Sequence, residues 1–183
     1  MGRKGTFYFF TGLAGAGKNT IGGLFYRALK KQRNDVLLFD GDVVRVARQE
    51  KPDYSNEARL ESCRRSMGMY KLITDQGIDV ICCAIAMFEE VREWYRTNLE
   101  NYREIYIKVP MEVLYQRDQK GLYSSGAKQV VGVDLPYEEP QNPDILIKND
   151  GAETPEEIVH RLLLSFGLSE NKIGLEYDAM DKK

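Results

Sequence analysis

The sequence contains a single histidine, three cysteines and no long hydrophobic run. With His160 alone, no zinc cluster can be assembled around histidine, and we expect a structural or surface role for this residue. Cys63, Cys82 and Cys83 stand among apolar neighbours, which argues against a disulfide framework and predicts a reducing, cytoplasmic environment. No apolar stretch approaches the roughly 20 residues of a membrane span, so we expect no membrane partner.

A strong charge of either sign is also missing. The 26 basic and 28 acidic residues leave a net charge of −2, which argues against nucleic acid as a partner. The 183 residues suit one domain with a hydrophobic core, which we place at residues 1–168, followed by a polar tail at 169–183. Near the N-terminus, "TFYFF" runs into Thr11 and Gly12 without a cleavage-like site, which indicates a buried strand and not a signal peptide.

Short apolar runs alternate with segments of helical spacing along the chain. We predict five strands, at residues 6–11, 35–40, 78–86, 104–109 and 145–147. Two of the predicted helices have clear starts, at Pro110 (through Asp118) and at Pro155 after a Thr154 cap (to about Phe166). This alternation predicts an α/β fold whose parallel sheet is covered by helices on both faces.

Residues 119–143 show neither a helical nor a strand pattern. They contain three glycines and three prolines. Because loops of this length in a compact domain are usually functional, we predict a lid, and we call these residues the lid segment.

A phosphate-binding loop (P-loop) follows the first predicted strand. Gly12 and Gly17-Lys18 stand at the spacing G-x-x-x-x-G-K, between a strand and a helix. Glycines allow backbone N–H groups to turn toward phosphate oxygens, the helix N-terminus favours their charge, and the lysine reaches the β- and γ-phosphates. We therefore predict ATP binding by Gly12, Gly15, Ala16, Gly17, Lys18, Asn19 and Thr20.

Asn19 stands where such loops carry a serine or threonine hydroxyl for magnesium. Its carbonyl is a hard oxygen, but it lies one atom further out, and Thr20 is turned about 100° around the helix. We expect Mg²⁺ to be held less firmly, or through water, by Asn19 and Asp40.

Asp40-Gly41-Asp42 ends the second predicted strand, at the edge of the sheet where α/β proteins bind ligands. Carboxylates there can hold magnesium-bound water and accept a proton from an acceptor hydroxyl. The alternative for Asp42 is a helix N-cap. Four arginines follow on helical segments and suit an anionic acceptor if they converge: Arg45, Arg59, Arg64 and Arg65.

Five segments together resemble adenylylsulfate kinase over about residues 5–167: "FFTGLAGAGKNT", "LLFDGDVVR", "ESCRR", "RDQKGLY" and "GVDLPYEEPQNPDI". The resemblance implies a P-loop kinase fold with a parallel five-stranded sheet and a mobile lid. It also implies transfer of phosphate from Mg-ATP to the 3′-hydroxyl of adenosine 5′-phosphosulfate (APS). The sequence itself does not determine the oligomeric state, but dimers are common in the family, so the resemblance makes a homodimer one option.

The resemblance carries over to single positions. Lys18, Asp40 and Asp42 match the phosphate and catalytic positions. On the acceptor side, Arg45 and Arg59 match arginines that contact the acceptor, and Tyr54 matches an aromatic residue that lies against its adenine. Ile85 lies where a backbone contact is expected, and Lys120 matches the lysine of the lid. Ser62 and Val130 replace an asparagine and a phenylalanine of the family's acceptor site.

Most departures from the family fall on the acceptor side. Val43 replaces an asparagine, "CAIAMFE" (83–89) replaces "SFISPYR", and the lid is about four residues shorter. Three hypotheses stay open: a kinase that makes the phosphorylated APS product, a kinase of the same fold for another nucleotide-linked acceptor such as a cytidine diphosphate derivative, and a nucleotide-binding protein without catalysis.

Overall fold

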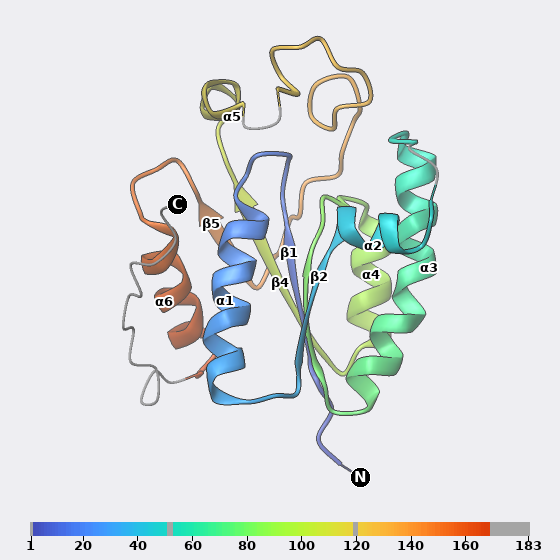
Figure 1. Cartoon of the computed structure of the whole chain (residues 1–183), viewed down its shortest axis with the longest axis vertical. Coiled ribbons are helices and arrows are strands. Elements are labelled where there is room, and N and C mark those ends of the chain that lie inside the picture. The colour runs from blue at the N-terminus through green and yellow to red at the C-terminus, as the bar shows by residue number, and fades with distance from the viewer. Residues whose placement is uncertain (1, 51–52, 119–120, 169–183) are drawn as a thin grey trace.

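A computed structural model describes residues 2–50, 53–118 and 121–168. Five parallel strands form one sheet in the order β2-β3-β1-β4-β5 (Figure 1). Their bounds are β1 Thr6–Thr11, β2 Val36–Asp40, β3 Asp79–Cys83, β4 Asn101–Lys108 and β5 Ile145–Lys148. The predicted α/β fold with a parallel five-stranded sheet is confirmed.

Six helices connect and cover the strands in the described part of the chain. They are α1 Lys18–Gln32, α2 Gly41–Ala47, α3 Asn56–Asp75, α4 Glu89–Asn98, α5 Met111–Arg117 and α6 Pro155–Ser165. Helices α1 and α6 cover one face of the sheet, and α3 and α4 cover the other (Figure 1). None of these helices combines the length and the hydrophobicity that a bilayer crossing needs.

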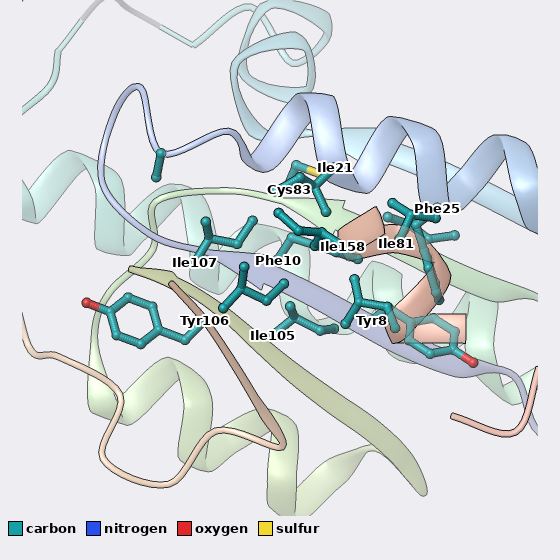
Figure 2. Close-up of a cluster of buried hydrophobic side chains, with 14 of the residues drawn as sticks. Tyr8, Phe10, Ile21, Phe25, Ile81, Cys83, Ile105, Tyr106, Ile107 and Ile158 are labelled. Atoms are coloured by element: carbon teal, nitrogen blue, oxygen red, sulfur yellow. The ribbon is translucent and has the colours of Figure 1, made fainter. Parts of the chain in front are cut away.

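The side chains of β1 point alternately to the two faces of the sheet and so contribute to both hydrophobic cores. Tyr8 and Phe10 pack under α1 and α6, in the core drawn in Figure 2. Phe7 and Phe9 pack on the opposite face, against α3 and α4. Successive strand residues point to opposite faces, so a fully apolar strand fits a sheet that is covered on both sides.

The cysteines follow the same rule. Cys82 belongs to the core under α3 and α4, and Cys83 belongs to the core under α1 and α6. Cys63, Cys82 and Cys83 are all free thiols. The predicted absence of a disulfide is confirmed for these three residues.

Two predicted strand boundaries are wrong by three residues, and the others agree within one residue. The predicted strand 78–86 ends at Cys83, because its neighbour β2 ends at Asp40, which pairs with Cys83. The strand predicted at 104–109 begins three residues earlier, at Asn101, which pairs with Thr6. Polar residues in its first half hid the pattern. In α6 the predicted cap is confirmed, since Thr154 and Glu157 form a reciprocal capping box.

Residues 121–143 of the lid segment lie between α5 and β5, above the carboxyl ends of the strands (Figure 1). Its described residues, 121–143, form neither a helix nor a strand, apart from an isolated bridge between Val131 and Leu135. The predicted lack of regular structure is confirmed for these residues. The predicted tail at 169–183 lies outside the described residues.

Candidate active site

The P-loop runs from the end of β1 into α1, and its two end glycines are sterically required. Gly12 has a φ of 147°, and a Cβ there would lie 2.3 Å from the Ile107 carbonyl oxygen. Gly17 has a φ of 96°, and a Cβ there would lie 2.7 Å from Asn149 Nδ2. The positive φ disfavours larger residues at both positions, and at Gly12 the contact with backbone excludes them as well.

Lys18 is the first residue of α1 and is buried beneath the loop. Its Nζ donates a hydrogen bond to the Leu13 carbonyl oxygen, at 2.8 Å. The ammonium group therefore lies inside the curve of the loop, beside the N-terminus of α1, and this combination can hold phosphate.

Two residues outside the P-loop brace it. Asn149 Nδ2 donates to the Ala16 carbonyl oxygen (2.9 Å), and the Tyr123 hydroxyl donates to the Ala14 carbonyl oxygen (2.8 Å). Asn149 directly follows β5, and Tyr123 belongs to the lid segment. Sequence reasoning missed Asn149, for which the only signal is its place at the carboxyl end of a strand.

Asp40, the last residue of β2, caps α2. Its Oδ1 accepts hydrogen bonds from the backbone N–H groups of Asp42, at 2.8 Å, and Val43, at 3.4 Å. Asp40 has extended backbone angles, as N-cap residues do, and the helix begins at Gly41. The alternative that Asp42 caps this helix is therefore wrong.

Asn19 reaches across from α1 to the same carboxylate. Its Nδ2 donates a hydrogen bond to Asp40 Oδ2. In this orientation the amide nitrogen of Asn19, which cannot bind a cation, faces the Asp40 carboxylate, which can bind one. Asn19 therefore orients Asp40, and its own oxygen would have to rotate to become a ligand.

The carboxylate of Asp40 is a suitable ligand for magnesium. Magnesium in kinases needs only one or two carboxylates, because phosphates and water complete its octahedral shell. No group of three histidine, cysteine, aspartate or glutamate side chains suited to a metal ion occurs in the part of the chain that the structure describes. Asp40 would hold the ion directly or through water, and Asn19 would donate to Asp40.

A cleft of about 330 Å³ opens between the P-loop, α2, the start of α3 and the lid segment. Its lining brings together most of the predicted site residues: Gly15, Gly17, Lys18, Asn19, Thr20, Asp40, Asp42, Arg45, Tyr54, Arg59, Ser62, Ile85 and Val130. Gly12 and Ala16 are buried behind the loop. Lys120 lies outside the described residues.

Tyr54 and two arginines form the acceptor side of the cleft. The guanidinium carbons of Arg45 and Arg59 lie 4.8 and 5.4 Å from the centre of the Tyr54 ring. Arg59 Nε also donates to the Tyr54 carbonyl oxygen, at 2.9 Å. Burial, followed by the nearby charge of Arg45, lowers the pKa of Arg59. Two partly desolvated positive groups beside an aromatic ring suit a nucleotide with an anionic extension.

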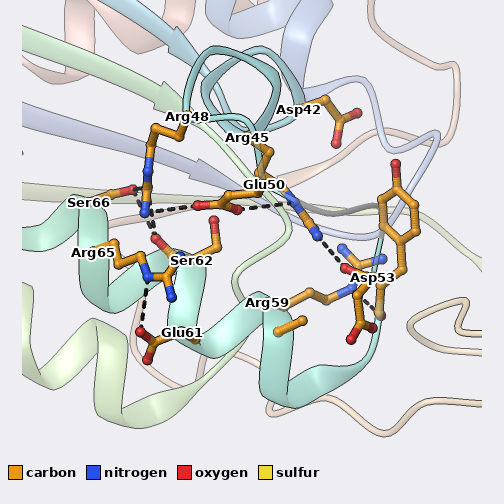
Figure 3. A network of polar contacts seen from close by, with 12 residues as sticks. Asp42, Arg45, Arg48, Glu50, Asp53, Arg59, Glu61, Ser62, Arg65 and Ser66 are labelled. Carbon is orange, nitrogen blue, oxygen red and sulfur yellow. Dashed lines mark hydrogen bonds and ion pairs between the residues drawn. The ribbon is translucent and has the colours of Figure 1, made fainter.

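Glu50 forms ion pairs with Arg45 and Arg48, as Figure 3 shows. Its Oε1 lies 2.9 Å from Arg48 Nη2, and its Oε2 lies 3.6 Å from Arg45 Nε. Arg48 Nη1 in turn donates to Ser66 Oγ, at 2.6 Å, and to the Ser62 carbonyl oxygen. Sequence reasoning missed Glu50 and Arg48, because nothing local in the sequence indicates their pairing.

Other predicted residues behave differently. Arg64 pairs with Glu90 and Arg65 with Glu61, and both arginines are exposed and absent from the cleft lining. They do not join the convergent arginines. Ile85, where a backbone contact with the acceptor is predicted, lines the cleft, and its carbonyl oxygen accepts a hydrogen bond from Thr11 Oγ1 at 2.8 Å.

The lid segment also lines the cleft. Val130 is 5% exposed and lines the cleft, so an aliphatic side chain stands where the family resemblance implies an aromatic one. Lys128 and Gln129 line the cleft beside it and were missed by sequence reasoning.

Comparisons with known proteins agree with this geometry. The sequence profile of the family described as adenylylsulphate kinase matches residues 4–148. The cytidine diphosphoramidate kinase of Campylobacter jejuni is 37% identical over 162 residues, covering 86% of this chain and 94% of its own. The adenylyl-sulfate kinase of Gloeothece citriformis is 36% identical over 169 residues, covering 88% and 96%.

Solved structures give the same relationship. The APS kinase of Mycobacterium tuberculosis, in complex with AMPPNP and APS, superposes with a TM-score of 0.80 at 26% identity. The alignment covers 91% of this chain and 99% of that one. A hexameric APS kinase from Thiobacillus denitrificans has a TM-score of 0.66 at 27% identity, over 90% of this chain and 29% of that one. A homodimer stays a prediction for this chain.

Proposed function

This chain belongs to the adenylylsulphate kinase family and is an ATP-dependent kinase, and we propose that its acceptor is a nucleotide with an anionic 5′ extension, with a cytidine diphosphate derivative fitting at least as well as APS. The observation that carries the proposal is that Tyr54 and Val130 both line the cleft, with an aliphatic side chain at Val130 where the family resemblance implies a second aromatic one. One wall can stack on a base, and the other offers only aliphatic contact.

The phosphate side of the cleft supports phosphoryl transfer from ATP. Lys18 and the P-loop would hold the β- and γ-phosphates, and Asp40 would hold magnesium, which neutralises phosphate charge when bound. Asp42, exposed in the same cleft, would accept the proton of the acceptor hydroxyl as its oxygen attacks the γ-phosphorus and ADP leaves. These three groups lie in one cleft, which disfavours nucleotide binding without catalysis.

The acceptor side supports an anionic nucleotide of either base. Arg45 and Arg59 offer their charges to a diphosphate-like or phosphosulfate extension. Tyr54 supplies one stacking face, worth ~1–3 kcal/mol per base, and Val130 supplies no second one. A purine base therefore gains little binding energy over a pyrimidine. The name of the C. jejuni relative, a cytidine diphosphoramidate kinase, is consistent with a cytidylyl acceptor.

APS is the second candidate. The retention of Tyr54, Arg45 and Arg59 at the positions where the family resemblance places acceptor contacts favours it, and so do the adenylyl-sulfate kinase relatives. A single panel separates the candidates.

The panel measures ADP release from Mg-ATP with APS, with cytidine diphosphoramidate and with no acceptor. We expect acceptor-dependent release with the cytidylyl compound at least as fast as with APS. ADP release with APS but not with the cytidylyl compound would show that APS is the acceptor. Release with neither compound would reject a nucleotide with an anionic 5′ extension as the acceptor.

A further inference from the structure

Gln129 has an unusual place in the lid segment. It lines the cleft next to Val130, and its φ of 62° lies in the left-handed region, which non-glycine residues rarely occupy. Such conformations persist only where surrounding contacts fix them, and they gather at ligand-binding sites.

Asp134 fixes this conformation. Its two carboxylate oxygens accept hydrogen bonds from the backbone N–H groups of Gln129 and Val130, each at 2.6 Å. The Val130 carbonyl oxygen also accepts from three backbone N–H groups, those of Val133, Asp134 and Leu135. This closed turn holds the Gln129 side chain toward the cleft wall.

The orientation of the Gln129 amide is determined by its partner. The backbone N–H of Tyr54 donates to Gln129 Oε1, at 3.2 Å. Because an N–H group can only donate, the oxygen faces Tyr54, and the Nε2 group remains as the polar end of the side chain. The amide thereby lies beside Tyr54, whose side chain also lines the cleft.

Resting on the proposed function, we propose that Gln129 is a specificity-determining residue whose Nε2 donates a hydrogen bond to the edge of the acceptor base. Because the amide oxygen accepts from the Tyr54 N–H, the amide offers a donor to the base, and a donor matches an edge with adjacent acceptors. Cytosine presents two adjacent acceptors on this edge, N3 and O2, whereas adenine presents only N1, between its N6 amino group and C2–H.

Gln129→Glu tests this donor. A carboxylate keeps the length of the side chain and can still accept from the Tyr54 N–H, but it has no hydrogen to donate. Gln141→Glu is the matched control, since it places the same charge on an exposed part of the lid segment that does not line the cleft. Gln129→Gly is the second variant, because glycine accepts the positive φ and removes only the side chain.

Two readouts are used. The first is kcat/KM for the cytidylyl acceptor relative to APS. The second is calorimetric binding of cytidine 5′-diphosphate to protein saturated with Mg-AMPPNP, which needs no turnover. For one lost hydrogen bond we expect Gln129→Glu to lower the ratio and the affinity roughly three- to tenfold, through KM and not kcat. Gln129→Gly should do the same while keeping its thermal midpoint, and Gln141→Glu should change neither readout.

The outcomes separate this inference from the proposed function. If no acceptor is phosphorylated but Gln129→Glu weakens cytidine diphosphate binding, the proposed function fails and the base contact stands. If wild-type protein phosphorylates the cytidylyl acceptor but Gln129→Glu changes neither readout, the contact is refuted and the kinase stands. A wild-type protein that does not bind cytidine diphosphate also refutes it.

Discussion

The Asn19 amide donates a hydrogen bond to the Asp40 carboxylate, and this contact joins the first turn of α1 to the end of β2. The same carboxylate caps α2 through its other oxygen. Asn19 therefore acts on the carboxylate best placed for magnesium, and it occupies the position where a P-loop hydroxyl would bind the ion itself.

Asn19→Ser should tighten magnesium binding and raise the kinase rate at low magnesium. A hydroxyl places a hard oxygen closer to α1 and releases Asp40 from the amide. The measurement is the initial rate as a function of magnesium concentration at saturating ATP. A variant that is slower than wild type at every magnesium concentration would mean that Asn19 is itself a productive ligand.

Lys18→Ala should abolish the stabilisation of the protein by Mg-ATP and leave the apo fold intact. The ammonium group lies within the P-loop and would meet the phosphates, and ligands stabilise the state that binds them. Thermal shifts with and without Mg-ATP measure this, with Lys31→Ala at the exposed end of α1 as the control. An ATP shift of wild-type size in Lys18→Ala would reject the assignment of the P-loop as the ATP site.

Asp42→Asn should lower kcat about 10²- to 10⁴-fold and change ATP affinity little, because a general base acts mainly in the transition state. Single-turnover rates and ATP binding are measured on the same preparation. Glu57→Gln, an exposed change in the first turn of α3, serves as the control. Near-normal turnover in Asp42→Asn would show that another group or the solvent takes the proton.

The three thiols should be unreactive in the folded protein at pH 8. Burial raises the pKa of Cys63 and of Cys83 to about 12, and it raises the pKa of Cys82 as well. Since the thiolate is the reacting species, it is scarce four units below such a pKa. Titration with a chromogenic disulfide should count no fast thiol in native protein and three in denaturant. One thiol that reacts at the rate of free cysteine before unfolding would contradict this.

Local patterns explain why the fold was predictable. The continuous apolar run of β1 and the Thr154–Glu157 capping box depend on neighbouring residues, so they can be read without knowing the partners. The early start of β4 could not be, since Asn101 becomes strand only by pairing with Thr6, about a hundred positions away.

The candidate site divides in the same way. The P-loop glycines are fixed by a contiguous motif. Glu50 matters through its pairs with Arg45 and Arg48, and Gln129 matters through a turn held by Asp134 and a contact with Tyr54. Such roles arise from the folded arrangement of side chains, and their residue types alone do not indicate them.

Val130→Phe should shift acceptor preference toward the adenylyl compound. The phenyl ring would supply a second stacking face opposite Tyr54, worth up to ~1–3 kcal/mol. Because Val130 is buried, the thermal midpoint is recorded beside the kinetics, and Val133→Phe in the same turn, at a half-exposed position, is the matched control. An unchanged preference in a well-folded Val130→Phe protein would remove Val130 from the base site.

The ratio of kcat/KM for the cytidylyl acceptor to that for APS, measured on the wild-type protein, tests the account most directly. With one stacking wall at Tyr54 and an aliphatic wall at Val130, we predict a ratio near one or in favour of the cytidylyl compound. A preference for APS above about a thousandfold, about 4 kcal/mol, would exceed what one stacking face supplies and would contradict the account.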